Sequence, residues 1–179
     1  MRQQTANEFD LEFERGGSAK EPHARLRMLV DGLEVDQGAI DGVALLNASL
    51  TPGRHYPFTC LCGDAGCAAI EDGVDVAIKG SWVQWTLRLP QSNRGFESYE
   101  DWKRLVKPTV WIFDQRQMLE EIRQELVYAD VTHPWKTEYA GFGLNRRYII
   151  RMIERIDYRL PRIKKAHWQP EMTEQLYQI

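Results

Sequence analysis

The sequence contains no long hydrophobic run and only a few cysteines. Among its 179 residues, no apolar stretch approaches the roughly 18–20 residues that a membrane-spanning helix requires. The beginning of the chain also lacks the apolar segment of a signal peptide. The three cysteines all lie between residues 60 and 67, whereas a secreted disulfide framework has an even number spread along the chain. We therefore expect a cytoplasmic protein without a membrane segment.

Recognisable catalytic motifs are also missing. The four histidines are widely scattered, at His23, His55, His133 and His167. The chain has no Gly-x-Ser-x-Gly nucleophile elbow, no phosphate-binding loop and no dinucleotide fingerprint. Adjacent acids such as Glu120 and Glu121 are common on solvated surfaces. We accordingly predict no catalytic residue, no bound cofactor and a non-enzymatic function.

Period-two alternation of apolar and polar residues in the front half predicts half-buried strands. We expect strands over residues 9–13, 26–30, 33–35, 74–78 and 83–89. The pair Asp31-Gly32 is a tight-turn signal between the second strand and the third. Residues 39–50 are more helix-like and stop at a Pro-Gly pair.

The back half has mainly helical patterns. Residues 110–113 predict one short strand, and Asp114 after it predicts a helix N-cap. The apolar stripe of that helix consists of Met118, Leu119, Ile122 and Leu126. A short helix is predicted over residues 98–105, and a longer one from Gly143 to Pro161. The predicted buried face of the longer helix is Leu144, Tyr148, Ile149, Met152, Ile153 and Ile156.

Together these patterns predict an α+β fold, with an antiparallel β-sheet from the front half packed against helices from the back half. The length suits one domain, which we place at residues 1–160, followed by a polar C-terminal tail over 161–179. On the strand at 83–89, the alternation predicts that Trp85 points into the core. Trp82 has the opposite parity, so we predict that it is exposed.

Basic residues are concentrated near the end of the chain. Residues 144–168 contain eight Lys or Arg against two acidic residues, although the whole chain carries a net charge of −3. Such a segment can be a nucleic-acid arm, but it is more often a solvated helix face or one docked on an acidic protein surface. Arg147, Arg151 and Arg155 recur every four residues. We predict that they form one such stripe and do not bind DNA specifically.

The most distinctive segment is the cysteine knuckle, which we define as residues 60–67 (Cys-Leu-Cys-Gly-Asp-Ala-Gly-Cys). In an extended chain, Cys60 and Cys62 point the same way because residues two apart share a face. The glycine-containing turn that follows can bring Cys67 back towards them. We therefore predict that the three sulfur atoms converge.

Three interpretations of the knuckle stay open. A zinc site needs a fourth ligand, for which His55 is the nearest candidate, although its five-residue separation from Cys60 places it on the opposite face of an extended strand. A redox centre would join Cys60 to Cys62, with Cys67 as the resolving thiol. Nearby acidic residues oppose the thiolate that such chemistry needs. The favoured interpretation is packing, since buried cysteine behaves as a small hydrophobe.

Residues 58–68 have the pattern FTCxCGxxGCA, which resembles a motif of small bacterial proteins of unknown activity. With Val74 and Val76, Val83 and Trp85, and the helix opening at Phe113-Asp114, the resemblance covers about residues 50–130. The motif often ends in Cys-Ala-Gly, whereas this chain has Ala69 at the last position. The resemblance implies a cytoplasmic, β-rich protein of a stress-response or toxin-immunity type. It implies no functional residue.

We therefore predict a non-enzymatic accessory or binding protein that acts through protein–protein contacts. The alternative is a thiol-redox or zinc-binding protein whose knuckle (Cys60, Cys62 and Cys67) responds to oxidants. The expected partner is a protein rather than nucleic acid or membrane, and a homodimer is compatible with the sequence.

Overall fold

The computed structural model describes residues 6–17, 22–35, 39–59, 73–88, 108–132 and 146–164, of which 15–17 and 22–25 are described in their backbone alone. In this part of the chain, three antiparallel sheets pack with three α-helices, which confirms the predicted α+β fold. No helix among the described residues is long and apolar enough to cross a membrane.

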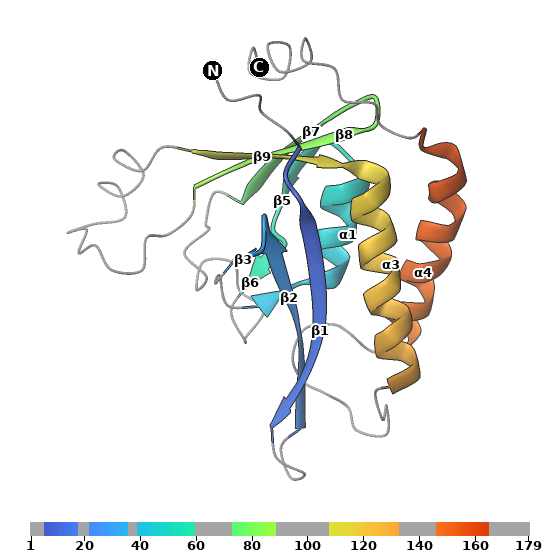
Figure 1. The fold of residues 1–179 in the computed structure, drawn as a ribbon. Helices are drawn as coiled ribbons and strands as arrows, with labels where there is room; N and C mark the ends of the chain where they lie inside the picture. The colour runs from blue at the N-terminus through green and yellow to red at the C-terminus, as the bar shows by residue number, and fades with distance from the viewer. Residues whose placement is uncertain are drawn as a thin grey trace, which may run out of the picture.

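The first sheet is a long antiparallel ribbon with a short third strand (Figure 1). Its strands are β1 (Phe9–Gly17), β2 (Pro22–Val30) and β3 (Leu33–Glu34). The register pairs Phe9 with Val30 and Leu11 with Met28, so the apolar residues of both strands share one buried face. The predicted turn between β2 and β3 is present. Asp31 and Gly32 both have positive φ angles there, of 54° and 75°, as a tight hairpin turn of this kind requires.

The second sheet has four strands in the order β5-β7-β8-β9, all antiparallel. They are β5 (Gly53–His55), β7 (Val74–Lys79), β8 (Trp82–Leu87) and β9 (Thr109–Asp114). A separate two-stranded pair joins β4 (Ala39–Ile40) to β6 (Phe58–Thr59). The sheet therefore takes its edge strand β9 from the back half of the sequence, where a short strand was predicted.

The helices are α1 (Gly42–Leu50), α3 (Gln115–Thr132) and α4 (Arg146–Arg159), and α4 runs into the 3₁₀ turn η2 (Leu160–Arg162). Two aspartates begin the first two helices as N-caps. The Asp41 carboxylate accepts hydrogen bonds from the backbone of Val43 and Ala44, at 2.9 and 3.0 Å. Asp114 does the same for the backbone of Arg116, at 2.8 Å, as its position after the strand predicted. Helix α1 starts after Asp41 rather than at residue 39, because Ala39 and Ile40 pair with β6.

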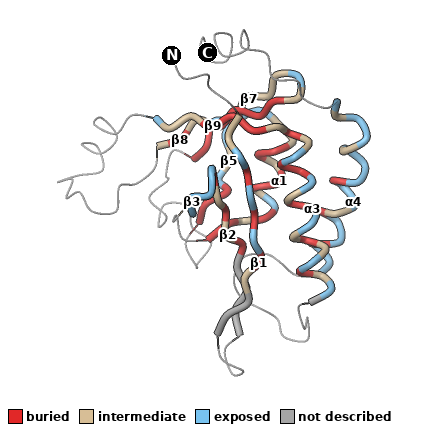
Figure 2. Tube along the Cα trace, in the orientation of Figure 1, coloured by how far each residue is buried: buried red, intermediate tan, exposed pale blue. Residues whose placement is uncertain are grey.

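Helix α3 lies at the centre of the helical layer and contacts β1, α1 and α4 (Figure 1). It covers the outer edge of β1, where the Glu125 carboxylate accepts a hydrogen bond of 2.8 Å from the Phe13 backbone N–H. Helix α4 packs against the side of α3. Figure 2 shows the buried residues gathered between the sheets and α3, with the outward side of α4 exposed.

Several aromatic rings pack against one another within the core. Trp85 is fully buried and meets Phe58 and Phe113 edge to face, with ring centroids 6.3 and 5.6 Å apart. Its indole N–H donates to the carbonyl of Ala48 on α1, at 3.2 Å. The prediction that Trp85 lies in the core is confirmed.

The prediction that Trp82 is exposed is wrong. Only 5% of Trp82 is accessible, and it packs with Ile112, Ala6 and Val110 in a small cluster on the other face of the four-stranded sheet. Gln84 on the same face is also buried. Alternation assigned the two tryptophans to opposite faces correctly, but it cannot tell that both faces are covered.

Helix α4 contains a second residue, Tyr148, whose burial differs from the prediction. Its residues Ile149, Met152 and Ile156 are buried as predicted, whereas Tyr148 is 45% exposed. One helical position corresponds to about 100° of rotation, so Tyr148 lies beside the buried stripe rather than within it. The predicted helix over 98–105 falls outside the described residues. In the predicted tail, Ile163 is partly buried against the main core.

Candidate functional site

The cysteine knuckle lies outside the described residues, so the convergence of its sulfur atoms stays a prediction. The described residues end at Thr59 before the knuckle and resume at Gly73 after it. Thr59, at the end of β6, is buried, and its hydroxyl has no hydrogen-bond partner among the described residues. On the other side, Gly73 has a φ of 69°, and a side chain there would come within 2.7 Å of the His55 carbonyl oxygen and 2.9 Å of the Tyr56 ring. The chain after the knuckle therefore passes tightly against the end of β5.

His55, the candidate fourth zinc ligand, is half-buried at this place. Its Nε2 lies 2.9 Å from the carbonyl oxygen of Thr51. A carbonyl oxygen only accepts hydrogen bonds, so Nε2 is the protonated nitrogen and Nδ1 is the one that can bind a metal. Histidines that bind metals commonly donate their other N–H to such a carbonyl. Among the described residues, no group of three or more His, Cys, Asp or Glu is placed to hold a metal ion.

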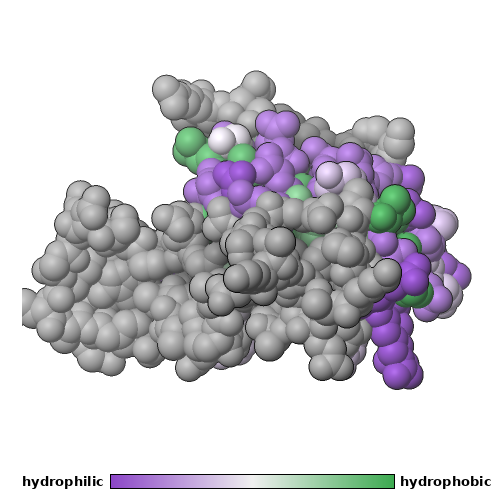
Figure 3. Space-filling model, turned by 90° about the horizontal axis from the view of Figure 1, so that it is seen from below, coloured by the Kyte–Doolittle hydropathy of each residue, from purple (hydrophilic) through white to green (hydrophobic). Residues whose placement is uncertain are grey.

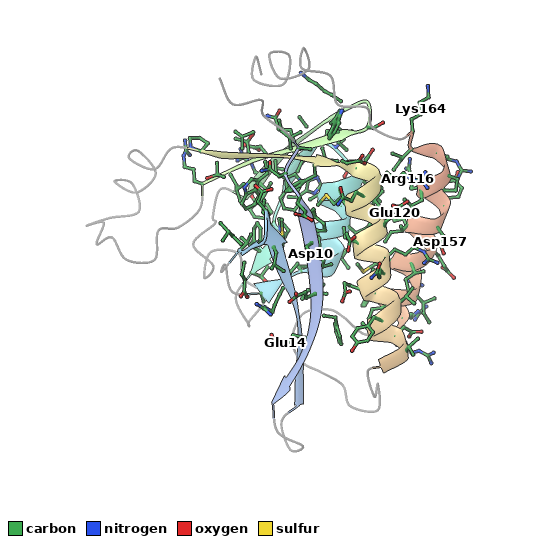
Figure 4. The ribbon with its side chains drawn as sticks, in the orientation of Figure 1. Asp10, Glu14, Arg116, Glu120, Asp157 and Lys164 are labelled. Carbon is green, nitrogen blue, oxygen red and sulfur yellow. The ribbon has the colours of Figure 1, made fainter. Side chains whose placement is uncertain are left out.

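Helix α4 carries the second candidate site, and polar contacts fix its position on the fold. Arg146 bonds Asp130 of α3 at 2.8 Å, and Arg123 of α3 bonds Asp157 at 2.5 Å, so an ion pair ties the two helices near each end of α4. Figure 4 labels Asp157 on α4. Beneath these pairs, the apolar stripe of α4 packs on the core. The helix is thus anchored along one side and presents the other outward.

A shallow, open hollow of about 500 Å³ lies on the outward side of α4. Its described lining is Arg146, Arg147, Ile150, Arg151 and Glu154. We call Arg147, Ile150, Arg151 and Glu154 the α4 face. These positions fall on one side of the helix because they recur at intervals of three and four residues. Figure 3, which views the molecule from below, shows hydrophobic side chains among hydrophilic ones on the side that the helices occupy.

Among the described residues, no neighbour neutralises the charges of the α4 face. Within the described part of the chain, Arg147, Arg151 and Glu154 form no hydrogen bond or ion pair. Arg146 differs, since its hydrogen bond to Asp130 raises the pKa of its guanidinium and offsets its charge. Between the unpaired charges lies Ile150, which is 40% exposed. An apolar contact ringed by available charges of both signs is typical of a protein-binding surface.

The predicted arginine stripe is divided by the tertiary structure. All three of its members are exposed, as expected. Arg155, however, turns towards α1 and donates a hydrogen bond of 2.7 Å to the side chain of Asn47. Arg147 and Arg151 remain on the hollow. The sequence analysis did not single out Ile150 or Glu154, although their helical spacing from Arg147 and Arg151 was the available signal.

An acidic seam lies on the opposite side of α3, where that helix meets β1. Burial raises the pKa of Glu121, and the charges of Asp10, Glu125, Glu120 and Glu8 raise it further. Figure 4 shows Asp10 on β1 and Glu120 on the neighbouring helix α3. The adjacency of Glu120 and Glu121 in the sequence suggested two ordinary solvated acids. Glu121 differs from that expectation because it is partly buried and lies among other acidic residues. The molecule carries negative charge along this seam and positive charge at the start of α4.

These two places, the end of β5 beside the knuckle and the α4 face, are the candidate sites of the described fold. No family model matches the chain, and no similar protein is found among curated proteins or solved structures.

Proposed function

We propose that this chain is a non-enzymatic accessory protein of the bacterial cytoplasm that binds a partner protein through the α4 face. The partner would be of the stress-response or toxin-immunity type that the motif resemblance implies. One observation carries the proposal. Two arginines and a glutamate without partners in the described part of the chain surround the exposed side chain of Ile150.

The mixture of charges favours a protein over a nucleic acid. Nucleic-acid surfaces bind mainly through phosphates, which a uniformly basic face neutralises. Glu154 would repel a phosphate backbone that followed the hollow past Arg151. Ile150 offers apolar contact that a phosphate cannot use. The acidic balance of the whole chain, at −3, adds to this preference.

The arginines suit recognition rather than proton transfer. A guanidinium stays protonated at any physiological pH, so it binds carboxylates in a fixed, two-pronged geometry and does not act as a general base. Arg147 and Arg151 would therefore hold acidic side chains of the partner. Arg146 already holds Asp130 and would contribute little.

The test compares two single substitutions on the same helix. Arg151→Glu reverses a charge in the hollow, and Arg159→Glu makes the same change at an exposed arginine that does not line it. Partner proteins captured from the source organism by the wild-type chain are quantified by mass spectrometry and then bound again in purified form. We expect Arg151→Glu to lose the partner at least tenfold and Arg159→Glu to keep it, with thermal melting confirming that both fold. A partner retained equally by both variants would refute the α4 face as its site.

A zinc-binding knuckle is the second candidate function, and the orientation of His55 favours it. Nε2 is engaged by the Thr51 carbonyl, which leaves Nδ1 to complete a site with Cys60, Cys62 and Cys67. Metal analysis of the purified chain tests this. About one zinc per chain, reduced in His55→Ala but not in His133→Ala, would support the zinc site. Protein free of zinc, with three slowly reacting thiols, would support packing instead.

A further inference from the structure

The charges of the α4 face follow a fixed order along the helix. Arg147 comes first, Arg151 lies one turn later and Glu154 a further three residues on. With a rise of 1.5 Å per residue, the two steps are about 6 Å and about 4.5 Å long. Ile150 lies between the arginines on the same side. The hollow is therefore positive towards the beginning of α4 and negative towards its middle.

The beginning of α4 reinforces this polarity. The first turn contains two arginines and no acidic residue, although the partial positive charge of a helix N-terminus favours acidic residues there. Asp130 pairs with Arg146, whereas Arg147 has no ion pair within the described part of the chain. An anionic group bound beside Arg147 would thus meet both a guanidinium and the positive end of the helix dipole.

We propose, on the basis of the protein-binding function above, that the occupant of the hollow is an α-helix of the partner running antiparallel to α4. In its own N-to-C direction, this helix presents one basic residue, an acidic residue three positions later and a second acidic residue after four more. The basic residue meets Glu154, and the two acidic residues meet Arg151 and Arg147. An apolar residue beside them packs on Ile150.

The spacing selects a helix over an extended segment. Positions three, four and seven apart share one face of a helix, so a second helix reproduces both steps. A strand presents same-face side chains only about every 6.7 Å, which does not match a step of about 4.5 Å. The antiparallel direction follows from the dipoles, since it brings the negative C-terminal end of the partner helix towards the positive start of α4. A helix laid on a groove in this way is a common mode of peptide recognition.

The test uses the full chain and two synthetic helical peptides of identical composition. One carries the order basic-x-x-acidic-x-x-x-acidic, and the other carries the reverse order, acidic-x-x-x-acidic-x-x-basic. Binding is followed by fluorescence anisotropy at low ionic strength. We expect the first peptide to bind up to about fivefold more tightly, because both peptides can form the three ion pairs but only the first forms them with its dipole antiparallel to that of α4. The variant Glu154→Lys should abolish or invert this preference, and Arg159→Glu should leave it unchanged.

Equal binding of the two peptides, or an unchanged preference in Glu154→Lys, would overturn the antiparallel helix. Failure of both peptides to bind at millimolar concentration would overturn it as well. The proposed function has a separate test. It would be refuted if the Arg151→Glu variant still bound a captured partner as well as the wild-type chain does. A partner that is lost in Arg151→Glu while neither peptide binds would mean that the α4 face recognises a surface other than a helix.

Discussion

At the scale of single residues, contacts between distant parts of the chain decide what each residue does. Gly73 and Gly80 show this clearly, since both have positive φ angles, of 69° and 60°. Around Gly80 there is open space, whereas Gly73 lies against the backbone of His55 and the ring of Tyr56. The two glycines share a backbone requirement and differ in their surroundings.

Substituting each glycine by alanine separates these two effects. Gly80→Ala should cost about 1–2 kcal/mol, the strain of a left-handed alanine. Gly73→Ala should cost at least about 1 kcal/mol more, because its methyl group would also displace the end of β5. Urea unfolding of both variants measures the difference. Equal free energies of unfolding would show that the close approach at His55 is absent in solution.

The two tryptophans of β8 give a second prediction at this scale. Trp85→Ala should lower the free energy of unfolding by about 3–5 kcal/mol, because it empties the centre of the main core. Trp82→Ala should also destabilise the protein, but by less, because its cluster contains few residues. Thermal and urea unfolding measure both. Wild-type stability in Trp82→Ala would contradict the buried position of this residue.

At the scale of the elements, the seam between β1 and α3 has an electrostatic cost. Glu125 closes the edge of β1 by accepting the Phe13 backbone N–H, and this packing brings α3 close to the acidic residues of β1. Glu121 is partly desolvated there and repelled by its acidic neighbours. The folded state therefore disfavours its ionised form.

This cost predicts a pH dependence with a definite sign. The pKa of Glu121 is raised above its ordinary value of 4.5, so its ionisation destabilises the fold increasingly as the pH rises through the folded-state pKa. Glu121→Gln should therefore raise the melting temperature at pH 7. The gain should disappear as the pH falls well below 4.5, where the carboxyl group becomes neutral in the folded and the unfolded state.

Glu120→Gln is the matched control for this prediction. Glu120 is exposed, bonds Arg116 at 2.8 Å and is only one of the acidic residues that repel Glu121. Glu120→Gln should therefore give a clearly smaller gain in melting temperature than Glu121→Gln. A gain that is equal in the two variants, or that persists well below pH 4.5, would mean that burial and repulsion at Glu121 are not its cause.

At the scale of the whole molecule, one asparagine joins the two larger sheets. The backbone N–H of Asn7 donates to the Ile112 carbonyl on β9 at 2.7 Å, and its side-chain oxygen accepts from the Ile112 N–H at 2.8 Å. Its side-chain amide donates to Asp31, at the turn after β2, at 2.7 Å. Asn7 thus completes the edge of β9 and holds the first sheet against it.

We expect Asn7→Ala to lower the free energy of unfolding by about 1–3 kcal/mol, since it leaves a partly buried backbone N–H without its acceptor. Gln124→Ala, at an exposed position of α3, is the control and should change stability by less than about 0.5 kcal/mol. Hydrogen exchange should also show faster exchange at Ile112. Unchanged protection of that amide would exclude the proposed role of Asn7.

Periodicity and capping were readable from the sequence because they depend on neighbouring residues. The alternation of β1, β2 and β8, the Asp31-Gly32 turn and the Asp114 cap all lie within a few residues of one another along the chain. The buried stripe of α4 was readable for the same reason, and with it the exposure of its arginines.

Only the tertiary structure decided which of these surfaces meet. Trp82 is buried because the second face of its sheet is also covered. The alternation of apolar and polar residues along a strand does not tell whether a face of the sheet is covered. The arginine stripe divides because α1 brings Asn47 within reach of Arg155 and leaves Arg147 and Arg151 on the hollow. Glu121 loses its ordinary solvation because β1 passes beside α3. Each outcome depends on segments far apart in the chain, whose proximity no local pattern records.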